Sequence, residues 1–159
     1  QASSRLQQAF TRLREELPSD DYIVEIGKAR VVREGRDLSI ITFGAMVLTA
    51  LDAAEELEKE GLDVEILDLR TLAPLDKASI LASVKKTSRA MVLHEASRTG
   101  GIGGEIAALI AEEAFEWLDA PVIRVASIDT PVPYSPPLED YYLPQTGDVV
   151  SAARKLAAY

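Results

Sequence analysis

The chain has 159 residues, a length that predicts one domain with a sizeable core. Its formal net charge of −9 excludes a general nucleic-acid binder, because phosphate backbones require a basic face. The absence of cysteine excludes disulfides, thiolate catalysis and zinc–thiolate sites. No apolar run approaches the roughly 20 residues that span a bilayer, and we expect no signal peptide and no membrane partner. With a single histidine, any metal site would depend almost wholly on carboxylates.

The first 20 residues predict a helical arm or linker, followed by a domain over residues 21–159. Leu6, Phe10 and Leu13 fall on one face of a helix. Pro18 and the acidic residues after it end that helix.

Two stretches rich in β-branched residues follow, residues 28–34 and 37–43, with Gly35 between them. This arrangement predicts a β-hairpin. The second stretch is almost continuously apolar, which is typical of a strand buried on both faces. The first strand of the hairpin is then expected at the antiparallel edge of the sheet.

Helical and strand periods alternate from there on. Apolar residues at helical spacing predict a helix that ends at Gly61, and Asp76 is typical of the N-cap of a further helix that runs to Lys86. The remaining predicted elements are strands over 64–69, 90–93 and 122–127, helices over 105–118 and 148–157, and an irregular proline-rich stretch before the last helix. This alternation predicts an α/β fold, a three-layer αβα sandwich around a mainly parallel five-stranded sheet with one antiparallel edge strand.

A glycine-rich turn over residues 99–104 joins a predicted strand to a predicted helix, where open α/β sheets place ligand sites. Gly101 and Gly103 begin a dinucleotide fingerprint, but Ile106 stands at its third glycine position and no Lys-Ser or Lys-Thr pair follows. Backbone amides at the helix start could still hold an anion, so an autonomous nucleotide- or anion-binding α/β domain that uses the glycine loop over residues 100–104 is one interpretation of the chain. The alternative is a tight turn that lets the helix pack close to the sheet.

His94 and Glu95 end the strand before this turn. A histidine in that place could act as a general base, which leaves a small hydrolase as one interpretation. No serine or cysteine stands in a recognisable nucleophile motif, however, and this favours a structural role for His94.

Three further features have simpler interpretations. A row of glutamates at helical spacing (Glu105, Glu112 and Glu116) predicts a solvated helix face. Phe115 and Trp117 are expected in the core or in an interface. The rigid run over residues 129–134 suits either a surface contact or a plain loop.

Taken together, these motifs resemble one family, the β subunits of the thiamine-diphosphate-dependent 2-oxo acid dehydrogenases (the pyruvate and branched-chain enzymes). More narrowly, they are similar to the C-terminal domain of that subunit, the transketolase C-terminal type. The resemblance covers about residues 21–159, and its motifs are residues 27–29, 67–76, 94–95, 100–106, 118–125, 129–134 and 143–144.

The resemblance implies that the active site lies in other parts of the enzyme. In the family, the α subunit carries the diphosphate and metal site, and the N-terminal domain of the β subunit carries the glutamate that activates the cofactor. We therefore expect no catalytic, cofactor-binding or metal-binding residues in this chain and no activity of the domain alone. Thiamine diphosphate and Mg²⁺ are expected in the parent enzyme, which decarboxylates a 2-oxo acid oxidatively and passes the acyl group to lipoyl.

The family also implies the partners of such a domain: the α subunit, a second β subunit and the small basic peripheral-subunit-binding domain of the acyltransferase. Its contacts with that binding domain match Asp119, which precedes an Ala-Pro pair, and Tyr159 at the C-terminus. The expected compartment is the bacterial cytoplasm, with the mitochondrial matrix as the alternative.

Overall fold

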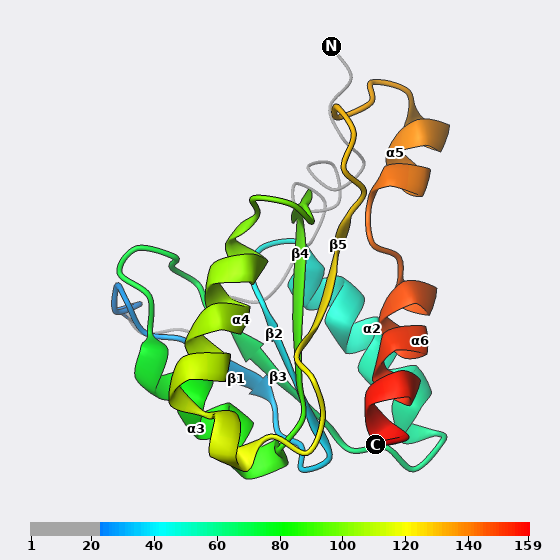
Figure 1. The fold of residues 1–159 in the computed structure, drawn as a ribbon. Helices are drawn as coiled ribbons and strands as arrows, with labels where there is room; N and C mark the ends of the chain where they lie inside the picture. Colours follow the sequence, from blue (N-terminus) through cyan, green and yellow to red (C-terminus); the bar gives the residue numbers. More distant parts are fainter. Residues whose placement is uncertain (1–22) are drawn as a thin grey trace.

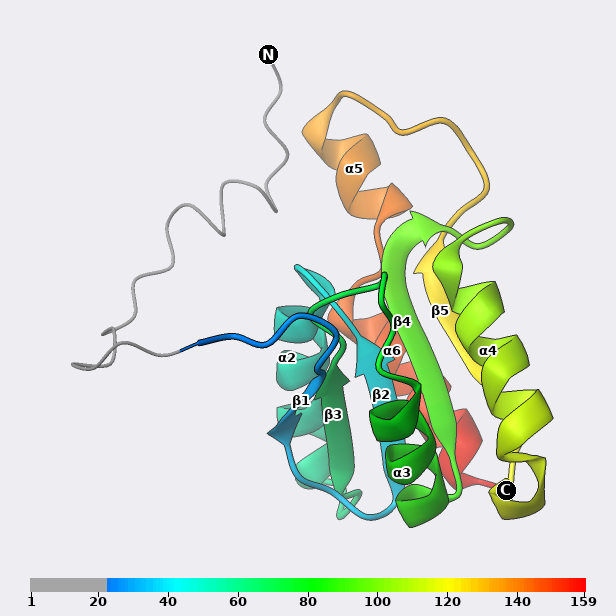
Figure 2. The same cartoon turned by 90° about the vertical axis from the view of Figure 1, so that its left-hand side faces the viewer.

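The computed structural model describes residues 23–159, so the predicted helical arm lies outside the described residues. One sheet contains five strands in the order β1-β3-β2-β4-β5 (Figures 1 and 2). Four of them run parallel, and β1 is antiparallel at one edge. The strands are β1 (Arg30–Arg33), β2 (Leu38–Thr42), β3 (Val64–Asp68), β4 (Ala90–Ser97) and β5 (Ile123–Ser127).

The predicted hairpin is wrong, because the two strands on either side of Gly35 do not pair with each other. β3 lies between them and pairs with both. The amides of Arg36 and Asp37 both donate to the carbonyl oxygen of Asp63, at 3.1 and 2.9 Å, which fixes the connection beside the start of β3. A Cβ at Gly35 would lie 2.2 Å from the backbone nitrogen of Glu65, so only glycine fits there. The antiparallel edge position of β1 is confirmed.

Helices cover both faces of this sheet, as the three-layer prediction requires. α2 (Met46–Glu58) and α6 (Thr146–Ala157) lie on one face, and α3 (Lys77–Thr87) and α4 (Ile102–Glu113) lie on the other. Each of these helices is too short to span a bilayer, and no other helix among residues 23–159 is long and apolar enough to do so.

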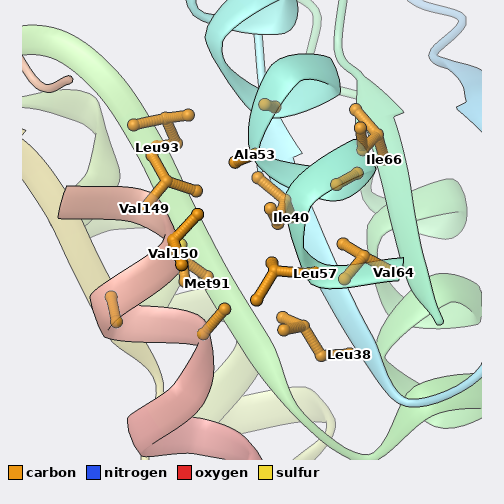
Figure 3. Close-up of a cluster of buried hydrophobic side chains, with 14 of the residues drawn as sticks. Leu38, Ile40, Ala53, Leu57, Val64, Ile66, Met91, Leu93, Val149 and Val150 are labelled. Atoms are coloured by element: carbon orange, nitrogen blue, oxygen red, sulfur yellow. The ribbon is translucent and has the colours of Figure 1, made fainter. Parts of the chain in front are cut away.

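The core follows from the two-residue period of the strands. Side chains of successive strand residues point to opposite faces, so Ile40 packs under α2 and α6 whereas Ile41 packs under α3 and α4. Figure 3 shows the first of these clusters, where Leu57 of α2 and Val150 of α6 meet over Ile40 and Met91. All five residues of β2 are buried, which confirms the prediction of a strand covered on both faces.

Asp76 caps α3, as the sequence predicts, and also ties β1 to this helix. Its carboxylate accepts hydrogen bonds from the Ser79 amide (3.2 Å) and from the Ala29 amide (3.0 Å). Burial raises the pKa of Asp76, but the hydrogen bonds from Ala29 and Ser79 outweigh burial, and the pKa lies below its usual value of 3.8.

Two helix predictions differ from the structure. α4 begins at Ile102 rather than at Glu105, and it ends at Glu113, before a separate 3₁₀ turn over Phe115–Trp117. The proline-rich stretch, predicted as irregular, contains the short helix α5 (Pro136–Tyr142). Its two leading prolines suit the first turn of a helix, where an amide hydrogen has no intrahelical partner. α5 lies beyond the carboxyl ends of the parallel strands (Figure 1).

Candidate functional site

The glycine-rich loop after β4 packs directly on the ring of His94. A Cβ at Gly103 would lie 2.3 Å from Nε2 of His94, and one at Gly101 would lie 2.7 Å from its Cε1. No side chain can occupy either place without moving the ring. The two glycines let the first turn of α4 approach the sheet, so packing accounts for them without a ligand. The nucleotide-binding alternative gains no support from this geometry.

His94 itself is completely buried. Neither ring nitrogen makes a hydrogen bond within the described part of the chain. Burial lowers the pKa of His94 below its usual value of 6.5. The nearby backbone of Ala96 acts to raise this pKa, and the positive charge of Arg124 acts to lower it, so that the pKa stays below 6.5. The imidazole is therefore neutral near pH 7, in a place that substrate cannot reach. This favours the structural role.

His94 and Glu95 do not form a catalytic pair. The ladder between β4 and β5 becomes irregular just after His94, and the two neighbours differ in burial, since His94 is buried and Glu95 is exposed. His94 lies under α4, whereas Glu95 is exposed beside α5, in a pocket of about 400 Å³. The lining of this pocket is mostly apolar and comprises Phe43, Glu95, Ala96, Val132, Glu139, Tyr142 and Leu143. Nothing in this arrangement supports the hydrolase interpretation.

Asp119 lies at the end of the sheet where the parallel strands begin. Its amide donates to the carbonyl oxygen of Ser88 at 2.9 Å, just before β4, and this bond fixes the backbone there. The following residue, Ala120, is buried, but Asp119 is exposed. No basic side chain among residues 23–159 forms an ion pair with its carboxylate. Asp119 therefore presents an uncompensated negative charge on a fixed backbone.

Tyr159 lies at the same end of the sheet as Asp119 (Figures 1 and 2). Arg154, one turn earlier, holds α6 to the loop after α2 through two hydrogen bonds to the Glu60 carboxylate, at 3.0 and 2.5 Å. The Tyr159 amide donates to the carbonyl oxygen of Leu156 at 3.3 Å, and its side chain is 68% exposed. The backbone of Tyr159 is thus held in place, and its aromatic ring is exposed to solvent.

Phe115 and Trp117 lie near Asp119 in the chain, and their predicted place in the core is wrong. Phe115 is 72% exposed and Trp117 is 41% exposed. The helical period that would bury them stops at Ala114, and the 3₁₀ turn directs both outward. Lys85 covers the indole of Trp117, with its Nζ 3.9 Å from the ring centroid. Their interface interpretation stays a prediction. The predicted solvated helix face is confirmed for Glu105 and Glu112, which are exposed on α4, whereas Glu116 is exposed in the 3₁₀ turn beyond that helix.

The rigid run that begins at Asp129 is fastened to the glycine-rich loop. The Asp129 carboxylate accepts hydrogen bonds from the amide (2.8 Å) and the hydroxyl (2.7 Å) of Thr99, and these bonds lower the pKa of Asp129. Beyond this contact, Val132 and Tyr134 are exposed. The segment is therefore held in place at Asp129 and exposed to solvent at Val132 and Tyr134.

Side chains that could hold a metal ion are not brought together in the described part of the chain. Residues 23–159 contain no group of three or more histidine, aspartate or glutamate side chains that could hold a metal ion. The one histidine is enclosed by glycines and the sheet. These residues offer no set of side chains for the Mg²⁺ that accompanies thiamine diphosphate.

The fold and this arrangement place the chain in the class of α/β domains. The glycines at the start of α4 allow this helix to pack closely on the sheet. Residues 27–149 match the family "Transketolase, C-terminal domain". This chain belongs to that family.

Curated relatives agree with this assignment. The chain is 49% identical over 150 residues to "Pyruvate dehydrogenase E1 component subunit beta" of Bacillus subtilis (strain 168), a match that covers 94% of this chain and 46% of that protein. It is 47% identical over 146 residues to the same subunit of Staphylococcus aureus (strain Mu50 / ATCC 700699), with coverage of 92% and 45%. The chain spans about half the length of these relatives. The predicted resemblance is confirmed.

Solved structures confirm the fold. One described as "Split gene transketolase, inactive beta4 tetramer" matches with a TM-score of 0.76 and 31% identity, over 91% of this chain and 46% of that chain. A 2-oxoglutarate:ferredoxin oxidoreductase from Magnetococcus marinus shares the fold with a TM-score of 0.52 at 19% identity, over 82% of this chain and 19% of that one.

Proposed function

We propose that this chain is a non-catalytic assembly domain of the β subunit of a thiamine-diphosphate-dependent 2-oxo acid dehydrogenase. It holds subunits together and receives the acyltransferase core. The observation that carries this proposal is that Asp119 and Tyr159 are both exposed and both held at the backbone by a hydrogen bond. We call these two residues the amino-end surface.

The chemistry of the parent reaction belongs to other domains in this proposal. When bound there, thiamine diphosphate supplies the carbanion stabilisation for decarboxylation of the 2-oxo acid. The described residues of this chain contain no group of side chains that could hold the metal ion, which supports a role outside the cofactor site. The bacterial sources of the curated relatives support a bacterial cytoplasmic enzyme that acts on pyruvate.

The partner of the amino-end surface is the small basic peripheral-subunit-binding domain of the acyltransferase. A chain with a net charge of −9 attracts a basic domain at long range, and complementary charges speed encounter and fix register. At contact, the Asp119 carboxylate offers an acceptor that no cation of residues 23–159 occupies. The Tyr159 ring offers an amphipathic anchor, and such aromatic residues are enriched in interfaces.

Subunit association is the second part of the proposed role, with the α subunit and a second β subunit as partners. One similar structure is described as an inactive β4 tetramer, which supports association between β-type chains and inactivity of such chains on their own. Exposed apolar side chains at the other end of the sheet, Val132 and Leu138 among them, suit a subunit contact.

A charge reversal tests the docking surface. We expect Asp119→Lys, and separately Tyr159→Ala, to weaken binding of the cognate peripheral-subunit-binding domain by at least about tenfold, because each removes a contact that faces the partner. Isothermal titration calorimetry of the 159-residue chain measures the affinity. Asp52→Lys is the matched control, since Asp52 is an exposed aspartate in the middle of α2, away from the amino-end surface. Unchanged affinity in both test variants, or equal loss in the control, would refute this docking surface.

A further inference from the structure

The outermost strand, β5, has one free backbone edge. β5 pairs with β4 in regular parallel register from Ile123 to Ala126, and no strand of residues 23–159 lies beyond it (Figure 2). Outside that ladder, the described chain sends a single backbone hydrogen bond to β5, from the Arg98 amide to the carbonyl oxygen of Ser127 (3.0 Å). Its outward amides and carbonyls before Ser127 therefore keep the capacity to pair with another strand.

The opposite edge of the sheet differs. The register of β1 shifts between Val31 and Arg33, which marks a bulge or irregularity. Arg33 also folds back, with Nε 3.2 Å from the Val64 carbonyl oxygen and its guanidinium 3.5 Å from Glu58. Bulges and charged side chains are the usual protection of an edge against strand addition. β5 has no bulge between Ile123 and Ala126.

A groove of about 640 Å³ runs along the free edge of β5, and four consecutive strand residues (123–126) line it. Val125 packs toward α2 and α6, whereas Arg124 reaches past Gly104 of α4 to the carbonyl oxygen of Arg98, at 3.0 Å. Because these neighbours point to opposite faces, a hollow that includes both has the strand edge as its floor. Ser151 of α6 and Tyr141 of α5 stand at its sides.

The groove is cationic although the chain is acidic. Arg98, Arg124 and Lys155 all line it, and none of them forms a close ion pair with a carboxylate of residues 23–159. Asp129 lies outside the groove, but near enough to Arg98 and Arg124 for their charges to help lower its pKa. Its one acidic lining residue, Asp148, already accepts a hydrogen bond from the Gln145 amide at 2.9 Å. The charge of this groove is thus opposite to that of the amino-end surface.

We propose that this groove binds an extended acidic segment of a partner protein, which adds a strand to the edge of β5. Main-chain hydrogen bonds supply affinity in such strand addition, and side chains at alternate positions supply specificity. The carboxylates of the segment would meet Arg98, Arg124 and Lys155. A second copy of this chain is disfavoured as the occupant, because pairing of β5 with itself would bring the same cations together.

Synthetic peptides test this proposal. The probe is an acetylated peptide of about eight residues, the length of an ordinary strand, that alternates threonine and glutamate. We expect it to bind the 159-residue chain, and to bind at least about tenfold more weakly to Lys155→Glu and to Arg124→Gln. Lys59→Glu, an exposed lysine of the α2 C-terminus outside the groove, is the matched control and should change the affinity less than about twofold. Lys155 is exposed, so its variant does not disturb packing.

Two further readouts separate strand addition from simple charge attraction. We expect the peptide to slow hydrogen exchange of outward amides within residues 123–127, and we expect N-methylation of alternate peptide amides to abolish binding. The proposal is overturned if the N-methylated peptide or the threonine–lysine counterpart binds equally well. Failure of the acidic peptide to bind, an unchanged affinity in both groove variants, or displacement of the peptide by an equal concentration of inorganic phosphate would overturn it as well.

Discussion

At the scale of single residues, the contact between His94 and the glycines of α4 explains the feature of the sequence that most resembles an active site. The glycines were open to two interpretations, an anion cradle or a close helix–strand contact. Sequence spacing alone does not distinguish these, because both require a residue without a Cβ. The distances to the imidazole favour the close helix–strand contact.

Gly103→Ala tests the close contact. The new Cβ would lie 2.3 Å from Nε2 of His94, so we expect overpacking to lower the free energy of unfolding by about 1–3 kcal/mol. Urea denaturation measures this loss. Gly147→Ala is the matched control, since nothing lies within 4 Å of its Cβ in the first turn of α6. Combining Gly103→Ala with His94→Ala should recover part of the loss, and strictly additive losses would contradict the contact.

The buried imidazole also predicts a pH dependence. Because burial holds the pKa of His94 in the folded state below 6.5, the unfolded chain binds the proton more readily. The contribution of the neutral His94 to the free energy of unfolding is therefore complete above about pH 6.5. It is lost as the pH decreases from there toward the pKa of His94 in the folded state. As His94 is the one histidine of the chain, thermal unfolding between pH 7 and pH 5.5 reports on it directly. His94→Gln should flatten this decline, and an unchanged slope would refute the assignment.

At the scale of the elements, local patterns predicted most helices and strands correctly, but not the neighbours of each strand. β1 and β2 adjoin in sequence, yet β3 pairs with both, and no local signal specifies such long-range pairing. α5 was missed because prolines suggest an irregular stretch, although they suit the first turn of a helix. The cationic groove could not be predicted from the sequence, because it depends on long-range contacts, as the pairing of β3 does. Arg98, Arg124 and Lys155 are far apart in sequence, and only the fold brings them to one edge.

Asp76 joins two elements and allows a prediction at this scale. Asp76→Ala removes both the cap of α3 and the acceptor for the Ala29 amide beside β1. We expect it to lower the free energy of unfolding by about 1–2 kcal/mol, and Asp76→Asn to cost less. Chemical denaturation measures both, with Asp52→Ala, an exposed site within α2, as the control. Equal stability of Asp76→Ala and the control would show that the cap and its bond to Ala29 contribute nothing.

At the scale of the whole molecule, the two surfaces differ in charge and in the way they would bind. The amino-end surface offers an acidic side chain and an aromatic ring, and we assign it to a basic folded domain. The β5 groove offers cations and a free strand edge, and we assign it to an extended acidic segment. Both assignments agree with a domain that connects subunits.

The central claim is that this chain joins other proteins while the reaction takes place on its neighbours. It is tested most directly by measuring release of carbon dioxide from pyruvate by the 159-residue chain alone, with thiamine diphosphate and Mg²⁺ supplied. The preparation should first unfold cooperatively, which shows that it is folded. We predict no release above that of the cofactor without protein. Turnover by the chain alone would contradict the account.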